Sequence, residues 1–133
     1  MPRDSLNIST TQQRQIIDIT DLVQAKVRAM GVAQGIACIS VAHCTCAIYV
    51  NENEAGLVAD TLRLIIAASR GDWHHDSIDD NAAAHLSATL LGSSVTLPIT
   101  AGALEFGTWQ RLMFVELDGP RSRGLTIQVV ADK

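Results

Sequence analysis

The chain has 133 residues, 47% hydrophobic and 18% charged, and this composition predicts a single globular domain spanning residues 1–133. A formal net charge of -4 and an aromatic content of only 4% argue against phosphate-backbone binding and base stacking, so we expect no nucleic-acid partner. No apolar run reaches the roughly 20 residues that span a bilayer, so we expect no membrane partner and a cytoplasmic location.

The amino-terminal quarter predicts two strands and a helix. Residues 5–19 contain several β-branched side chains and favour two short strands, followed by Thr20 as a helix cap. Apolar residues then recur at helical spacing over residues 21–30, and Gly31 stands where a helix would end. We therefore expect strand, strand and helix in that order.

Residues 35–50 form the clearest predicted strand, because their side chains alternate between two faces. On one continuous strand His43 and Thr45 share a face, and Cys44 and Cys46 share a face. All three cysteines lie in this segment, and their odd number argues against a complete disulfide framework, so we expect reduced thiols. A buried structural role is the main interpretation of Cys44 and Cys46, with a zinc pair as the alternative.

The second half predicts two helices and then a series of strands. An amphipathic helix over residues 57–66 follows an acidic segment that suits its positive end. After the polar loop 71–77, Asp79 and Asp80 can cap a second helix over residues 81–91. The remainder alternates apolar runs with turn residues and predicts a β meander with strands at residues 95–99, 104–106, 109–117 and 125–130.

Three of the four histidines have polar neighbours that suggest a functional site. His43 lies on the predicted strand, His75 in the loop beside aspartates, and His85 on the second helix, one turn after Asn81. Imidazoles are common metal ligands and acid-base groups, and ligands from separate elements can converge on one pocket. No tight metal-binding spacing is present, so an ordinary packed or exposed histidine is the alternative for each of them.

Other polar residues offer substrate contacts. Asn51 and Glu52 follow the His43 strand and could bind a cation, orient an imidazole or cap the next helix. Gln110 closes the segment Gly107-Thr108-Trp109-Gln110, which suits either a polar ligand or a strand start with a packed Trp. Arg121 and Arg123 lie on a turn where forked guanidinium donors suit phosphate, although solubilising charge is the commoner role of such residues.

In combination these motifs closely resemble the YjbQ-like family over roughly residues 5–131. The matching segments are His43 to Ile48, Asn51 to Glu54, His75, Asp80-Asn81, His85-Leu86, Leu91 to Ser94, Gly107 to Gln110 and Glu116 to Arg123. The resemblance implies an α+β fold, a compact β-sandwich of mostly antiparallel strands with flanking helices, assembled as a homotrimer.

The resemblance also implies site residues. It places the family's histidines at His43, His75 and His85, in a site that can hold a metal, and its acid and amide positions at Asn51, Glu52, Asp80 and Asn81. The family commonly has a His-Thr-(Ser/Thr)-Ala pattern, and cysteines at 44 and 46 depart from it. That departure leaves open whether thiols contribute to the site.

Members of this family are often labelled secondary thiamine-phosphate synthases, which suggests a transferase acting on a phosphorylated small molecule. We expect His43, His75, His85 and Glu52 to be catalytic and the three histidines to bind any zinc or magnesium ion. The residues expected to contact substrate are Thr45, Asn51, Asn81, Gln110 and Arg121. The alternatives are a metal-dependent phosphate-ester hydrolase and a non-catalytic trimeric module that binds a metal or an anion.

Overall fold

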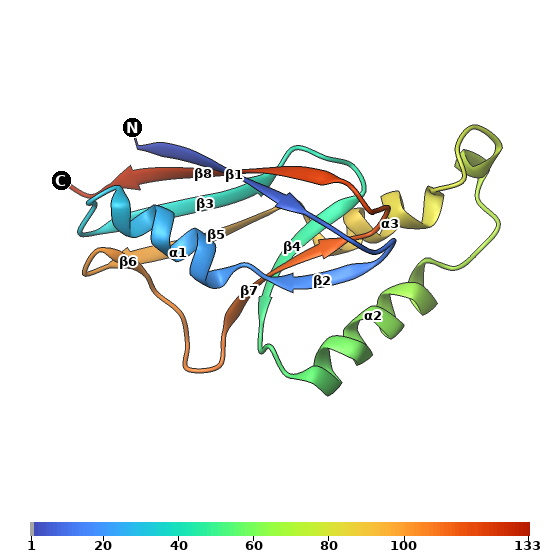
Figure 1. Cartoon of the computed structure of the whole chain (residues 1–133), viewed down its shortest axis with the longest axis horizontal. Coiled ribbons are helices and arrows are strands. Elements are labelled where there is room, and N and C mark those ends of the chain that lie inside the picture. Colours follow the sequence, from blue (N-terminus) through green and yellow to red (C-terminus); the bar gives the residue numbers. More distant parts are fainter. Residues whose placement is uncertain (1) are drawn as a thin grey trace.

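The computed structural model describes residues 2–133, which form strands, α-helices and one short 3-10 helix (Figure 1). No helix in this range is long and apolar enough to cross a membrane. The elements in chain order are β1 (Arg3–Ser9), β2 (Gln15–Asp18), α1 (Thr20–Ala29), β3 (Gly35–Val41), β4 (Cys46–Asn51), α2 (Ala55–Ser69), η1 (His74–Ser77), α3 (Ala82–Leu91), β5 (Ser94–Thr100), β6 (Ala103–Leu104), β7 (Arg111–Glu116) and β8 (Ser122–Ala131).

Two antiparallel sheets build the fold. One has the strand order β1-β8-β3-β5-β6 and the other β2-β7-β4. Every strand pairing is antiparallel, so the prediction of an α+β fold with a mostly antiparallel β-sandwich and flanking helices is confirmed. Figure 1 shows α1 at one end of the sheets and the pair α2 and α3 at the other.

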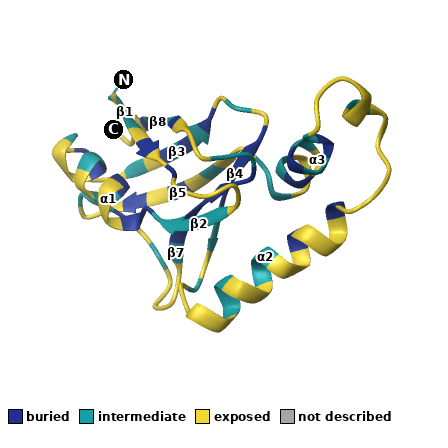
Figure 2. Cartoon of the chain, turned by 45° about the vertical axis from the view of Figure 1, so that its right-hand side comes forward, coloured by how far each residue is buried: buried dark blue, intermediate teal, exposed yellow. Residues whose placement is uncertain are grey.

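The smaller sheet is buried on both faces, because alternate residues of β7 enter two apolar clusters. Leu112 and Phe114 join the main core between the sheets, while Val115 and Leu117 pack in a second cluster with residues of α2 and α3. Figure 2 shows that α2 nevertheless presents most of its surface to solvent. The carboxyl end of β7 therefore lies where the sheet, α3 and the helix α2 meet.

The prediction of one continuous strand over residues 35–50 is wrong. The chain leaves the larger sheet after Val41 and enters the smaller one at Cys46, so residues 42–45 form a crossing loop. His43 and Thr45 therefore do not share a strand face. The two strands differ in partners and in burial. β3 pairs with β5 and β8 and its burial alternates, whereas β4 pairs with β7 and begins with three consecutive buried residues.

The predicted β meander is also wrong, although a strand lies in each of its four segments. Only β5 and β6 pair as neighbours in the chain, while β7 joins the other sheet and β8 inserts between β1 and β3. Local turn residues predict where strands end, but they do not determine which strand becomes the partner. That choice depends on which apolar faces meet in the core.

The helix caps differ from those expected. The carboxylate of Asp18, rather than Thr20, accepts hydrogen bonds at the start of α1, from the Thr20 N–H at 2.9 Å and the Thr20 hydroxyl at 2.6 Å. Glu54 caps α2. Asp76 of η1 accepts the Ala82 N–H of α3 at 3.0 Å, the role predicted for Asp79 or Asp80, and so ties η1 to α3.

Candidate functional site

Two of the predicted site histidines are in direct contact. His75 belongs to η1 and His85 to the first turn of α3, and their ring centroids lie 4.7 Å apart with the rings at 74°, edge to face. Both side chains are partly buried. The Asp76 cap on α3 brings the two elements together, because it fixes the short helix that carries His75 against the helix that carries His85.

A series of hydrogen bonds orients the His75 ring. The Asn81 amide nitrogen donates to Asp118 Oδ2 at 3.1 Å, and this leaves the Asn81 carbonyl oxygen facing His75 Nε2, also at 3.1 Å. An amide oxygen can only accept, so His75 Nε2 carries a proton and donates it. His75 Nδ1 is then the ring nitrogen left for chemistry when the imidazole is neutral.

Arg121 closes this series at the protein surface. Its Nε donates to the Asp118 backbone oxygen at 2.8 Å, and its Nη2 lies 3.2 Å from Asp118 Oδ2. The Arg121 side chain is 49% exposed, so the guanidinium keeps donors that solvent or a ligand can reach. Asp118 thus holds both Asn81 and Arg121, a role that no local sequence motif indicates.

His43 is held in a different way, from the crossing loop. The Gly124 backbone N–H donates to His43 Nε2 over 3.0 Å, so Nε2 is the acceptor and the neutral ring carries its proton on Nδ1. His43 and His85 line one cavity of about 360 Å³, together with Cys44, Cys46 and residues of α3. His85 therefore links the His75 contact to the cavity that His43 borders.

A buried ion pair is hydrogen-bonded to the crossing loop that carries His43. Arg123 is 2% exposed and Glu116 is fully buried, and Arg123 Nε donates to the two Glu116 carboxylate oxygens at 2.9 and 3.2 Å. Arg123 Nη2 also donates to the Thr45 backbone oxygen and hydroxyl, and the Thr10 hydroxyl donates to Glu116. Thr45 thus contacts Arg123 inside the protein. Only Arg121 of the two turn arginines is exposed, whereas phosphate binding and surface charge, the two interpretations of this turn, both placed the two guanidiniums at the surface.

The pair is strongly held in its charged form. Burial raises the pKa of Glu116, but hydrogen bonds from Arg123, the Asp118 N–H and Thr10 outweigh it and bring the pKa below its ordinary value. For Arg123, burial lowers the pKa and the hydrogen bonds to Glu116 more than compensate, so the pKa is raised. Both groups stay ionised near neutral pH and fix the loop that carries His43.

The cysteines and histidines do not form a metal centre within one chain. Burial raises the pKa of the Cys46 thiol to about 11, so it is not a thiolate near neutral pH, whereas Cys44 is exposed at the cavity. In residues 2–133, no three side chains of His, Cys, Asp or Glu are grouped so that they could hold a metal ion. His43 accepts a hydrogen bond at Nε2 and carries its proton on Nδ1, so the three histidines of one chain do not together offer three free ring nitrogens to a zinc or magnesium ion.

Three predicted site residues lie at the other end of the smaller sheet. Asn51 pairs with Arg111, whereas Cys46 pairs with Glu116, so five residue steps, or about 17 Å, separate Asn51 from the histidine end. Glu52 directly follows Asn51, and Gln110 directly precedes Arg111. One chain therefore does not bring Asn51, Glu52 or Gln110 to the histidines.

A second cavity at the histidine end contains cationic residues that sequence reasoning missed. This cavity of about 310 Å³ is lined by Arg14, Arg70, Asn81 and Asp118, among others. Neither Arg14 nor Arg70 has an ion-pair partner among residues 2–133. Arg14 lies before β2 and Arg70 after α2, and no local motif marked either of them.

Comparison with known proteins agrees with the resemblance. The sequence model of the UPF0047 YjbQ-like family matches residues 4–132. A UPF0047 protein from Archaeoglobus fulgidus is 41% identical over 128 residues, covering 94% of this chain and 98% of that protein. The UPF0047 protein YugU from Bacillus subtilis is 35% identical over 130 residues, covering 95% and 97%.

Solved structures resemble this chain in fold over nearly its whole length. A YbjQ-like protein of unknown function from Sulfolobus solfataricus superposes with a TM-score of 0.96 at 43% identity, covering 98% of this chain and 97% of that one. A YjbQ/UPF0047 protein from Clostridium acetobutylicum gives a TM-score of 0.89 at 35% identity, covering 96% and 99%. From the match over nearly its whole length, we conclude that this chain belongs to the UPF0047 YjbQ-like family.

Proposed function

We propose that this protein is an enzyme that acts on a phosphorylated small molecule, with the contacting pair His75 and His85 as its proton-transfer groups. The hydrogen-bonded series from Arg121 through Asp118 and Asn81 to His75 carries this proposal. A packed structural histidine does not need a ring orientation fixed by two further side chains, whereas an acid-base group does.

Charge supports the phosphorylated substrate. Arg121, Arg14 and Arg70 all lie around the Asn81 and Asp118 side chains, and none of them is buried. Guanidinium groups bind phosphate oxygens through paired donors. In this proposal Arg121 contacts an anionic group of the substrate and Asn81 positions His75, while His43 offers its Nδ1 proton at the cavity that it shares with His85.

Thiamine-phosphate synthesis is the reaction we propose first. The thiazole nitrogen bonds to the methylene carbon of the pyrimidine while the bond from that carbon to the diphosphate oxygen breaks, and diphosphate leaves with the electron pair. An imidazolium of the pair then protonates the leaving diphosphate. Arginine side chains stabilise the charge that develops on it. Thr45, Asn51, Glu52 and Gln110 have no step here, since Thr45 is buried and the other three lie at the far end of the sheet.

The test is an assay of the purified protein with the pyrimidine diphosphate and the thiazole phosphate, in which thiamine phosphate and diphosphate are measured together. We expect His75→Ala and His85→Ala to lower kcat by about 100-fold or more, as loss of an acid-base group does. His74→Ala is the matched control, because His74 is an exposed neighbour in η1 and no part of the series. Equal losses in all three variants would refute the assignment of His75 and His85.

Further assays of the same purified protein distinguish the two alternatives, a phosphate-ester hydrolase and a non-catalytic binding module. Release of inorganic phosphate from p-nitrophenyl phosphate, abolished by a chelator and restored by zinc or magnesium, would identify a metal-dependent phosphate-ester hydrolase. Absence of turnover with either set of substrates, together with loss of assembly on chelation, would identify a non-catalytic metal- or anion-binding module. Turnover that survives chelation of zinc would agree with the single-chain geometry, in which three metal ligands do not meet.

We also propose that the protein works as a homotrimer in the cytoplasm. Large apolar side chains are exposed on and beside α2 and α3, including Leu64, Ile78 and Leu90, and burial against other subunits would remove them from water. The free thiols of Cys38, Cys44 and Cys46 suit a reducing compartment. Light scattering at micromolar concentration tests the assembly, and a monomer mass would refute it.

A further inference from the structure

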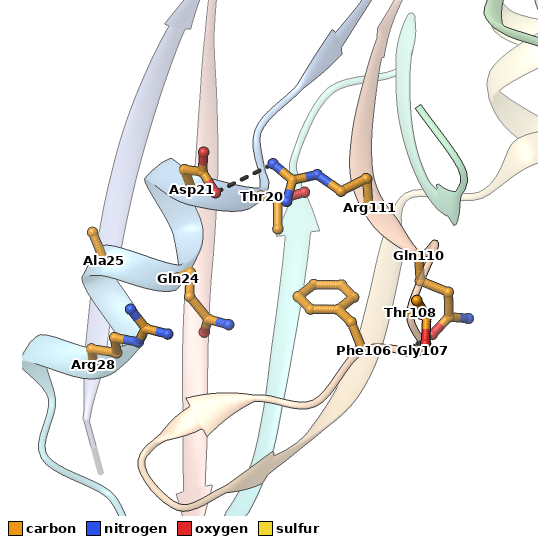
Figure 3. A pocket seen from close by; sticks show the side chains of 10 residues that line it. All are labelled: Thr20, Asp21, Gln24, Ala25, Arg28, Phe106, Gly107, Thr108, Gln110 and Arg111. Carbon is orange, nitrogen blue, oxygen red and sulfur yellow. Dashed lines mark hydrogen bonds and ion pairs between the residues drawn. The ribbon is translucent and has the colours of Figure 1, made fainter. Parts of the chain in front are cut away.

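A third cavity lies away from the histidines, at the α1 end of the molecule. It has a volume of about 450 Å³ and opens between α1 and the loop that joins β6 to β7 (Figure 3). It shares no lining residue with the two cavities at the histidine end. The volume falls in the range of small-molecule sites. The proposed reaction makes no use of this cavity.

An aromatic ring lines the cavity. Figure 3 shows the Phe106 ring between α1 on one side and the loop residues Thr108 and Gln110 on the other. Phe106 is half-buried and packs against the main core, so its ring is held in place, whereas Trp109 on the same loop is 72% exposed and is not among the lining residues. The chain has only two Phe, two Trp and one Tyr, so few aromatic rings are available to line a cavity. A fixed ring face favours a ligand with a planar ring.

The charged groups around the cavity differ in how firmly they are held. Arg111 donates to Asp18 at 2.7 Å and to Asp21 at 3.2 Å, so its charge is already compensated. Arg28, one turn of α1 after Gln24, has no ion-pair partner among residues 2–133. Figure 3 shows its guanidinium pointing toward the Gln24 side chain. Arg28 is therefore the cationic group of this cavity that remains to be paired.

The two amide side chains of the cavity are held in place. The Gln24 side chain bonds the backbone of Leu104 in both directions, with Leu104 N–H donating at 2.7 Å and Gln24 Nε2 donating at 3.1 Å. Gln110 Oε1 accepts the Gly107 N–H at 2.8 Å, so within residues 2–133 its amide nitrogen has no acceptor. This nitrogen is a preformed donor for a ligand that carries an acceptor.

We propose that this cavity binds a planar organic anion, a compound with an aromatic or heteroaromatic ring that carries one carboxylate or phosphate group. The ring lies against Phe106, and the anionic group pairs with Arg28. This site is independent of the histidine reaction, so each proposal stands or fails without the other.

The test is a titration of the full chain followed by ¹H–¹⁵N NMR, with benzoate and phenyl phosphate as probes. We expect the Gly107 backbone amide and the Gln110 side-chain amide signals to shift with a Kd of about 1 mM or below. Inorganic phosphate and cyclohexanecarboxylate, which lack either the ring or its planarity, should bind at least about 10-fold more weakly.

Two variants assign the contacts. Arg28→Gln should weaken both aromatic anions by about 10-fold, as loss of a charge-assisted hydrogen bond does, and Phe106→Leu should remove the preference for benzoate over cyclohexanecarboxylate. Lys26→Gln is the matched control, since Lys26 is also on α1 but pairs with Asp4 at 3.3 Å and does not line the cavity. Binding that is unchanged in Arg28→Gln, inorganic phosphate that binds as tightly as phenyl phosphate, or no shift with any probe would each overturn the proposal.

Discussion

The two ends of β7 carry the same kind of ion pair in different surroundings. At the carboxyl end Glu116 and Arg123 are 0% and 2% exposed, whereas at the amino end the side chains of Asp18 and Arg111 are 17% and 38% exposed. The buried pair lies under the histidine loop, and the more exposed pair borders the α1 cavity. Chemically equivalent ion pairs therefore have different structural roles at the two candidate sites.

The difference in burial determines what each ion pair contributes to stability. A buried pair that loses one partner leaves an uncompensated charge in the interior, whereas solvent replaces a lost partner at a half-exposed pair. The Arg123 pair also fixes the backbone at Thr45, two residues from His43, so it sets the geometry of the histidine end. The Arg111 pair can rearrange around a ligand at small cost.

The largest effect should come from breaking the buried pair. Glu116→Gln should lower the free energy of unfolding by about 3 to 5 kcal/mol, because Arg123 keeps its charge without a counter-ion. Asp18→Asn, the matched change at the other end, should cost about 1 kcal/mol, since Arg111 is more than a third exposed. Urea denaturation measures both. Equal losses of unfolding free energy in the two variants would remove the distinction between the two ends. A double variant, Glu116→Leu with Arg123→Met, that is more stable than Glu116→Gln would strengthen it.

The pH dependence of the unfolding free energy should distinguish Glu116→Gln from Asp18→Asn. The pKa of Glu116 is lowered in the folded protein, so its contribution to stability is complete above the ordinary value of 4.5 and is lost as the pH falls from there through the folded pKa. Unfolding free energies measured from about pH 6 to about pH 3 should therefore fall steeply in the unmodified chain and more gradually in Glu116→Gln. Asp18→Asn should keep most of the steep fall. A Glu116→Gln profile parallel to that of the unmodified chain would contradict the assignment.

A smaller effect on stability is expected from Asn81→Ala, which leaves the buried pair intact. The partly buried Asn81 side chain makes two hydrogen bonds, so we expect a loss of about 1 kcal/mol, together with a change in the ¹⁵N signals of the His75 ring nitrogens as Nε2 loses its acceptor. Turnover in the proposed reaction should fall by at least about 10-fold. Unchanged His75 ring signals would show that Asn81 does not orient the ring.

The smallest effect should follow from Asp21→Asn. The Asp21 side chain is 90% exposed, so its contact with Arg111 is largely screened and the change in unfolding free energy should stay within about 0.5 kcal/mol. Affinity of the α1 cavity for benzoate should rise slightly, because a negative charge that lines the cavity has been removed. A loss of more than about 1 kcal/mol in urea denaturation would mean that this end is as rigid as the other.

Local pattern predicted the elements better than it predicted their partners. The helices α1, α2 and α3 lie within a few residues of the predicted ranges, because apolar spacing and acidic starts are properties of short segments. The break between β3 and β4 was missed, since residues 42–45 contain no Gly or Pro to mark a turn, and the three consecutive buried residues that open β4 are revealed only by the fold. The capping role of Asp76 was assigned to later aspartates, because its hydrogen bond depends on the fold of η1.

The sequence by itself determined the three α-helices, most strand positions and, through the combined motifs, the resemblance to the UPF0047 YjbQ-like family that implied the antiparallel sandwich. Only the tertiary structure decided that His75 touches His85, that Arg123 is internal while Arg121 is exposed, and that Glu52 and Gln110 lie far from the histidines. Spacing along one element follows from backbone geometry, but distances between elements depend on which apolar faces pack together. Burial, which separates the two arginines, arises only when that packing is complete.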